Sequence, residues 1–188
     1  MSEVTYEFWK GTDAARQLDR FLPAYEEVYV EPPYCEGPRE IAEFIERFQR
    51  QAQRPGFRLA LACEGAEVIG FTFGYLLPAD TGWWDGLLEP LPEDCTRETG
   101  DRTFVIIELA VRKPWRRRGI ATALHAELLA GPVAERVTLT MRPEPEALPA
   151  QSAYAAWGYR RVGRSQPWDE APVYDSMVLD LGGGSAGG

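Results

Sequence analysis

The segment Thr103–Val111, with the sequence TFVIIELAV, constrains the fold of this chain more than any other stretch. Apart from the threonine and Glu108, all of its residues are apolar. A short apolar run of this kind, without polar alternation, is typical of a strand that is covered on both faces. The chain is therefore expected to form a sheet that has helices on both sides.

The rest of the sequence reads as short strands interleaved with helices. Turn residues separate the segments, and apolar residues at helical spacing mark the helices. The expected strands are residues 4–9, 57–65, 67–77, 103–111, 135–141, 160–165 and 173–181, and the expected helices are residues 12–29, 38–54, 119–130 and 149–158. This order predicts an α+β fold in a single domain, residues 1–181, with a mixed central sheet of about seven strands flanked by about four helices. The glycine-rich residues 182–188 are expected to form a flexible tail.

Composition and charge argue against several classes of partner. The chain has 188 residues and a net charge of −9, which disfavours a nucleic-acid partner. One histidine, and three cysteines without metal-ligand spacing, disfavour a metal site. No apolar run approaches the roughly 20 residues of a membrane span, and the first residues lack the pattern of a secretory signal. We therefore expect a reduced, cytoplasmic, metal-free protein with no membrane partner.

A strongly basic turn follows the apolar strand. In RKPWRRRGIA, residues 112–121, five cations fall within seven residues, directly before a helix-like stretch. A helix N-terminus presents unpaired backbone N–H groups, and arginines beside it add charge-assisted bonds, so the turn is a candidate phosphate site. The motif is neither a nucleoside triphosphatase loop nor a dinucleotide-binding fingerprint. A solvated turn is the alternative.

Two motifs in this chain resemble those of the GCN5-related N-acetyltransferase (GNAT) superfamily. The span from Glu108 to His125, ELAVRKPWRRRGIATALH, is similar to the family's motif A, in which an [RQ]-x-x-G-x-[GA] loop follows the fourth strand. Downstream, YAAWGY at Tyr154–Tyr159 fits the family's Y-x-x-x-G-[FY] pattern. The order of elements also matches, over roughly Val4 to Leu181. The resemblance implies a GNAT fold and transfer of an acetyl group from acetyl-CoA to an amine.

The resemblance also implies which residues hold acetyl-CoA. Amides of the basic loop would bind the pyrophosphate, and the end of the apolar strand would pair with the pantetheine arm, provided that it diverges from the strand at 135–141. The implied cofactor-binding residues are Leu109, Ala110, Val111, Arg116, Arg117, Arg118, Gly119, Ile120, Ala121 and Thr122. One departure is Ala147, where family members often carry asparagine. The cofactor contact of that asparagine is therefore absent or replaced here.

Two residues are candidates for proton transfer. Glu108 interrupts the apolar strand, where desolvation would raise the pKa of its carboxyl toward the range of a base near neutral pH. A carboxylate at the matching position commonly serves as base in the resembling family; the alternative is a structural ion pair with Arg112 or another arginine. The resemblance places the hydroxyl of Tyr154 near the CoA sulfur, as proton donor to the leaving thiolate, whereas its alternative is a packed helix aromatic. The lone His125 is given no catalytic role.

The acceptor site of the resembling family is bordered by the first two helices and nearby loops. Here the corresponding loop contains Glu31, Tyr34 and Glu36, and an acidic, irregular insert at residues 78–101 contains Trp83, Trp84 and Asp85. Carboxylates beside tryptophans suit a cationic amine through ion pairing and cation–π contact. The alternative is a solvated acidic loop in which the two tryptophans fill the core.

Taken together, the residues and the resemblance predict an acetyl-CoA-dependent N-acetyltransferase, an acyltransferase that acts on a primary amine without a covalent enzyme intermediate. The expected acceptor is a small cation, such as an aminoglycoside-like compound or a polyamine. A protein or peptide amine is an alternative acceptor. An inactive CoA-binding regulatory module is an alternative class of protein, and a monomer or a homodimer is expected.

Overall fold

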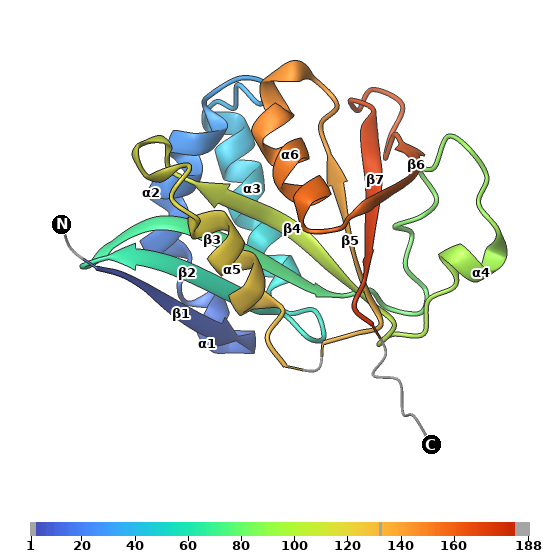
Figure 1. The fold of residues 1–188 in the computed structure, drawn as a ribbon, viewed down its shortest axis with the longest axis horizontal. Coiled ribbons are helices and arrows are strands. Elements are labelled where there is room, and N and C mark those ends of the chain that lie inside the picture. The colour runs from blue at the N-terminus through green and yellow to red at the C-terminus, as the bar shows by residue number, and fades with distance from the viewer. Residues whose placement is uncertain (1–2, 132, 183–188) are drawn as a thin grey trace. The chain divides into compact units, whose positions relative to one another are not determined.

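The computed structural model describes residues 3–131 and 133–182. The predicted tail, apart from Gly182, lies outside these residues. Figure 1 shows the elements in chain order. The strands are β1 Val4–Lys10, β2 Arg58–Glu64, β3 Glu67–Leu76, β4 Thr103–Val111, β5 Arg136–Met141, β6 Arg160–Ser165 and β7 Tyr174–Asp180. The helices are α1 Gly11–Ala15, α2 Leu18–Tyr29, α3 Pro38–Gln51, α4 Glu93–Thr96, α5 Ile120–Leu128 and α6 Leu148–Ala156, with single 3-10 turns at Lys113–Trp115 and Pro145–Ala147.

The strands form one seven-stranded mixed sheet in the order β1-β2-β3-β4-β5-β7-β6. Strand β4 runs parallel to β5, with Thr103 opposite Arg136, whereas β1–β2, β2–β3, β5–β7 and β7–β6 are antiparallel pairs. The predicted α+β class and the seven strands are confirmed. The predicted divergence of β4 from β5 beyond the paired residues stays a prediction.

The helices differ from the expected four in two places. The expected first helix is two helices, α1 and α2, because the amides of Arg16 and Gln17 bond back to the carbonyls of Thr12 and Ala14 and close the first helix early. The acidic insert contains the four-residue helix α4, which its acidic, proline-rich sequence does not indicate. The other three helices lie close to their predicted positions.

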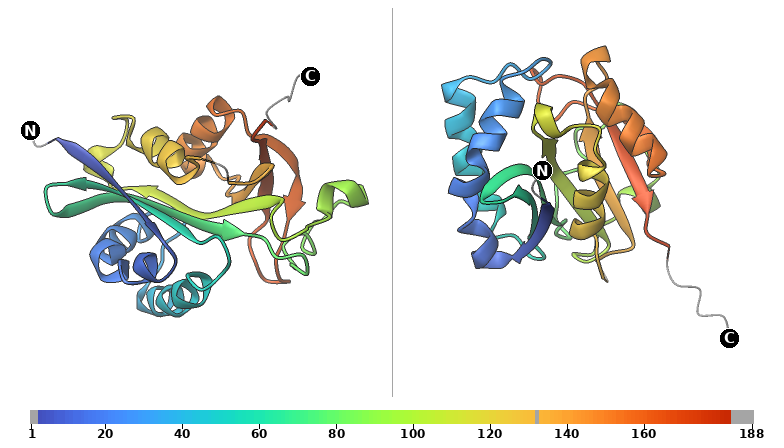
Figure 2. Two further views of the ribbon diagram at one scale, coloured as in Figure 1. Left: turned by 90° about the horizontal axis from the view of Figure 1, so that it is seen from below. Right: turned by 60° about the vertical axis from the view of Figure 1, so that its left-hand side comes forward.

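The chain divides into two compact units, of which the first comprises residues 1–75 and 106–133. Within it, α1–α3 cover one face of strands β1–β3, and α5 lies on the opposite face (Figure 2). Strand β3 approaches β4 and α5 closely at Gly70, where an added Cβ would lie 3.0 Å from the carbonyl oxygen of Ala110 and 3.1 Å from Leu124 Cδ1. Any larger residue would push these elements apart.

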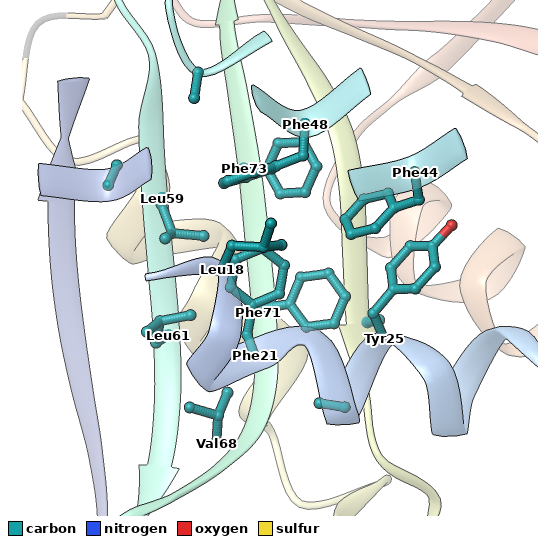
Figure 3. Close-up of a cluster of buried hydrophobic side chains, with 14 of the residues drawn as sticks. Leu18, Phe21, Tyr25, Phe44, Phe48, Leu59, Leu61, Val68, Phe71 and Phe73 are labelled. Carbon is teal, nitrogen blue, oxygen red and sulfur yellow. The ribbon is translucent and has the colours of Figure 1, made fainter. Parts of the chain in front are cut away.

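Aromatic side chains dominate the core between the first helices and the sheet (Figure 3). Phe21 of α2 contacts Phe48 of α3 edge-on, with ring centroids 5.2 Å apart, and lies 4.8 Å from Phe71 of β3. Tyr25 stacks on Phe44 at 3.6 Å, and its hydroxyl oxygen points away from the phenylalanines (Figure 3). This packing holds α2 and α3 firmly against the sheet and leaves the hydroxyl of Tyr25 at the edge of the aromatic core.

The second unit comprises residues 76–105 and 134–188. Helix α6 lies against the strands of this unit (Figure 1). The acidic insert is held to the edge strand β6: the amide of Leu88 donates to the carbonyl of Arg164 at 2.9 Å, and the amide of Gln166 donates to Gly86 at 2.8 Å. The insert is therefore a bonded extension of this unit and not a free loop.

Candidate active site

Glu108 lies on β4, and its carboxylate meets a tyrosine of the first unit. The hydroxyl of Tyr29, in the last turn of α2, donates a hydrogen bond to Glu108 Oε2. The backbone carbonyl of Glu108 accepts a bond from the hydroxyl of Thr72 on β3, at 2.8 Å. Among the described residues no hydrogen-bond donor to the other carboxylate oxygen, Oε1, is recorded. One oxygen is thus held and the other is free to accept a proton.

The pKa of Glu108 is raised to about 7. Desolvation is the main cause, because the carboxyl is enclosed by protein although part of the residue remains exposed. The hydrogen bond from Tyr29 and the charge of Arg47 lower this pKa, and the negative charge of Glu36 raises it. A carboxyl that titrates near neutral pH is suited to general-base catalysis.

A second carboxylate lies in the same part of the first unit. The hydroxyl of Tyr25 donates to Glu36 Oε2 at 2.8 Å, and the rings of Tyr25 and Tyr29 stack with centroids 4.3 Å apart. Burial raises the pKa of the Glu36 carboxyl, while Tyr25 and Arg47 lower it. Two carboxylates, each bonded to one of two stacked tyrosines, therefore share the field of a single arginine.

Tyr25, Tyr29 and Arg47 are not among the site residues predicted from the sequence. Tyr25 lies on the apolar face of α2, and that face reaches the core. The sequence did carry a signal for the two tyrosines, because a buried tyrosine hydroxyl needs a hydrogen-bond partner. Tyr25 and Tyr29 are four residues apart, so both side chains lie on one face of the helix.

The predicted phosphate loop leads into α5 in a left-handed backbone conformation. Gly119, the N-cap of α5, has φ 77°, and Arg117 has φ 61°. A left-handed conformation is readily adopted by glycine but costs roughly 1–2 kcal/mol at other residues. The first backbone bond of the helix runs from the amide of Ala123 to the carbonyl of Gly119. The amides at 120–122 therefore have no partner within the helix and can bind an anion.

The cations of the basic turn divide into two groups. Arg112 forms ion pairs with Glu27, at 2.7 Å, and with Glu67, so the alternative in which Glu108 pairs with Arg112 is wrong. Arg116 donates to the carbonyl of Val111 at 2.8 Å and to Glu31 at 3.0 Å.

In contrast, Arg117 and Arg118 are exposed, and no ion pair of theirs is recorded within residues 3–131 and 133–182. The first group shapes the loop, whereas phosphate binding by Arg117 and Arg118 stays a prediction.

The remaining predicted cofactor residues lie at the end of β4 and the start of α5. Leu109 is half-buried, Ala110, Val111 and Ile120 are buried, Ala121 is half-buried, and Thr122 is exposed. Ile120 anchors the first turn of α5 in the core of the first unit. The assignment of these residues to acetyl-CoA stays a prediction.

Tyr154 belongs to α6 in the second unit. Its ring is half-buried and lies edge-on to Trp157, at 5.4 Å, and to Tyr159, at 5.5 Å. Burial raises the pKa of the neighbouring Tyr159 hydroxyl, and Tyr154 raises it further. This aromatic setting is compatible with both interpretations of Tyr154, so its catalytic role stays a prediction.

The predicted acceptor residues fall in both units. In the first, Tyr34 is exposed and lies edge-on to Tyr29, with ring centroids 4.7 Å apart, and Glu31 is paired with Arg116 and Lys113. In the second, Trp83 is half-buried and Asp85 is exposed.

Trp84 differs from its neighbours in the insert. It is only 8% exposed, and its indole N–H donates to Glu98 at 3.0 Å. Its packing therefore follows the alternative in which it fills the core, and acceptor contact by this set of residues stays a prediction.

A comparison with protein families finds a match to the model of the acetyltransferase (GNAT) family over residues 21–159. This match shows that the chain belongs to that family. It confirms the predicted family and the predicted enzyme class, an N-acetyltransferase. No curated protein matches the chain.

Solved structures show the same fold at low sequence identity. PH1933 from Pyrococcus horikoshii OT3 has a TM-score of 0.68 and 17% identity, with 96% of this chain and 99% of that chain covered. NAA60 from Arabidopsis thaliana, in complex with acetyl-CoA, has a TM-score of 0.60 and 18% identity, with 96% and 100% covered. The PaiA N-acetyltransferase of Thermoplasma acidophilum, in complex with coenzyme A, has a TM-score of 0.60 and 12% identity, with 94% and 99% covered.

In the described part of this chain, none of the helices has the length and apolar character needed to cross a membrane.

Proposed function

We propose that this protein transfers the acetyl group of acetyl-CoA directly to the primary amine of a small cationic acceptor, such as an aminoglycoside-like compound or a polyamine. The observation that carries the proposal is the arrangement along β4. This strand presents a carboxylate of near-neutral pKa at Glu108, and three residues later its Val111 carbonyl binds Arg116, the head of the basic loop. Strand β4 therefore positions both the proposed base and the proposed anion-binding turn.

Acetyl-CoA is the cosubstrate, as expected for this family. The two solved structures with bound acetyl-CoA or coenzyme A that share its fold support the same cosubstrate. In the proposal, the free amides before Ala123 and the guanidinium groups of Arg117 and Arg118 bind its pyrophosphate. The end of β4 aligns the thioester arm, and the amide of Ala110 or Val111 polarises the acetyl carbonyl.

Glu108 takes one proton from the ammonium form of the acceptor through Oε1. The amine then forms a C–N bond to the acetyl carbon as the C–S bond breaks, and Tyr154 donates a proton to the sulfur that leaves with the bonding electrons. The nitrogen loses a second proton, which restores Tyr154, and one proton is released overall. Direct attack requires no enzyme nucleophile.

The described cysteines, Cys35, Cys63 and Cys95, form no disulfide. Three free thiols also support the proposed cytoplasmic location.

The small cationic acceptor is supported by charge. Glu36 and Glu108 lie near a single arginine, Arg47, so the first unit carries an uncompensated negative charge close to the base when both carboxyls are ionised. Such a site favours an ammonium ligand. Tyr34, exposed and edge-on to Tyr29, adds an aromatic surface for cation–π contact.

Two measurements test the function. Calorimetry with acetyl-CoA should detect binding, and the double substitution of Arg117 and Arg118 by alanine should weaken it by about tenfold or more. The exposed Arg50 of α3, changed to alanine, is the matched control and should bind as the parent protein does. Absence of any binding to the parent protein would overturn the proposal.

The acceptor is then identified by release of free CoA in the presence of aminoglycosides, polyamines and peptides with a free N-terminus or lysine. Turnover with small cations supports the proposal, whereas turnover with peptides alone would replace the acceptor class. Binding of acetyl-CoA without any turnover would identify a CoA-binding module. Tyr154→Phe should lower turnover while affinity for acetyl-CoA stays within about twofold; unchanged turnover would remove Tyr154 from the mechanism.

A further inference from the structure

The surroundings of Glu108 contain more than the base itself. Tyr29 of α2 holds one carboxylate oxygen, Tyr25 of the same helix holds Glu36, and the two rings stack. Glu36 is itself fixed, because its amide donates to the carbonyl of Tyr29 at 2.8 Å. The loop after α2 therefore closes back onto the helix end that carries the hydroxyl donor.

Arg47 of α3 completes this group. Its guanidinium lies over the ring of Phe44, 5.7 Å from the centroid, and Phe44 stacks on Tyr25. Phe44 and Tyr25 belong to the aromatic core of Figure 3, so this core connects the arginine to the stacked tyrosines. Arg47 acts by charge on both carboxylates without an ion pair to either within the described residues.

We propose that Tyr29, Glu36 and Arg47 are positioning residues for Glu108, a role that rests on the proposed function. The hydroxyl of Tyr29 binds Oε2 and leaves Oε1 to take the proton of the acceptor. Glu36 and Arg47, opposite in charge, adjust how readily Oε1 takes up that proton. Within the described residues, further titratable groups facing this cluster are Tyr34 from the loop, Tyr25 from α2 and Glu40 from α3.

The proposal predicts a rise in the pKa of Glu108 for two substitutions and a fall for a third. Tyr29→Phe removes a hydrogen bond that stabilises the charged carboxylate, so the pKa of Glu108 should rise. Arg47→Met removes a favourable positive charge, so the pKa should rise again. Glu36→Gln removes a like charge, so the pKa should fall. A merely structural role for these residues would not produce opposite signs.

The test is a carboxyl NMR titration of protein labelled with ¹³C in its glutamate side chains, without any substrate. The resonance of Glu108 is assigned by its loss in Glu108→Gln. We expect shifts of about half to one pH unit in the stated directions. Tyr75→Phe and Glu43→Gln are matched controls in the same unit and should leave the titration midpoint in place.

The pH dependence of kcat/KM is then measured for the same variants with the best acceptor. Its acid limb should move upward for Tyr29→Phe and downward for Glu36→Gln, in step with the NMR midpoints. A Glu108 midpoint that none of the three variants moves would overturn the inference, even in an active enzyme. NMR shifts of the expected signs in a protein without acetyl transfer would instead leave the network intact and remove the proposed function.

Discussion

Two carboxylates near the apolar strand β4 show how differently this chain treats a buried charge. In the second unit, Glu98 Oε1 accepts hydrogen bonds from the indole of Trp84, from the hydroxyl of Thr103 and from the guanidinium of Arg136, at 2.8–3.0 Å. In the first unit, the only hydrogen bond recorded to the carboxylate of Glu108 within the described residues comes from a tyrosine hydroxyl. Arg136 binds the carboxylate of Glu98 directly, whereas Arg47 acts on Glu108 by charge without an ion pair among the described residues.

The difference separates a structural carboxylate from a reactive one. Glu98 is paired with a cation, and Arg136 also lies 5.2 Å from the ring centroid of Trp84, so the cluster ties the acidic insert to β4 and β5 within the second unit. The cation bonded to Oε1 holds this carboxylate in place, while its other oxygen, Oε2, is buried without a hydrogen-bond partner among the described residues. Glu108 keeps one oxygen open and lacks a directly bonded cation, which is the arrangement that a base requires.

The largest expected effect is on catalysis at Glu108. Glu108→Gln keeps the shape of the side chain and removes the base, so kcat/KM should fall by about 10²–10⁴-fold. Glu98→Gln should leave the rate per folded molecule within about threefold of the parent. Rates measured on material whose folded fraction is known from circular dichroism make this comparison. An equal loss of rate in both variants would break the distinction between the two carboxylates.

The next effect is on stability at Glu98. The side chains of Glu98 and Arg136 are 1% and 8% exposed, so removal of the anion leaves a buried cation without its anionic partner. Glu98→Gln should lower the free energy of unfolding by about 3–5 kcal/mol in urea denaturation. Glu89→Gln is the matched control, because its pair with Arg164 is about half exposed and a surface ion pair contributes little to stability. Similar losses in both variants would mean that burial of the Glu98 pair carries no special stability.

The pH dependence of the free energy of unfolding tests the environment of Glu108 in the absence of catalysis. The folded-state pKa of Glu108, about 7, lies above the ordinary 4.5, so the folded protein binds more protons between these values and loses stability as pH rises through them. Glu108→Gln should remove this loss and gain, relative to the parent, up to about 3 kcal/mol between pH 5 and pH 8. Urea denaturation at the two pH values measures the gain, and Glu43→Gln should show none. A parallel pH profile for parent and Glu108→Gln would contradict a near-neutral pKa.

Much of the fold could be predicted from local sequence, because strand and helix periodicity are local properties. The apolar run of β4 and the helical spacing in α2 and α3 both identified their elements. The break at Arg16–Gln17 was not visible, since buried residues on either side of it, Ala14 and Leu18, continue the same core face. A local pattern therefore indicates which face is buried more securely than where a helix stops.

The candidate site likewise contains residues that a local sequence pattern identifies and partners that only the folded chain brings to them. Glu108 was identifiable because a lone carboxylate interrupts an apolar run, and the basic loop because its motif is contiguous. The partner of Glu108, Tyr29, lies 79 positions away in the sequence, and Arg136 lies 38 positions from Glu98. Such pairs depend on how the whole chain folds, and no local pattern in one sequence brings them together.

The smallest expected effect compares two adjacent tryptophans of the insert. Trp84→Phe keeps an aromatic ring beside Arg136 but removes the indole donor to Glu98, so unfolding should be easier by about 1 kcal/mol. Trp83→Phe, one residue earlier and half-buried, should change stability by less than half of that. If the insert is a structural extension of the second unit, neither change alters the Michaelis constant for the amine. A raised Michaelis constant in Trp83→Phe alone would instead show that one tryptophan anchors the insert while its neighbour contacts the acceptor, as the sequence predicted for both.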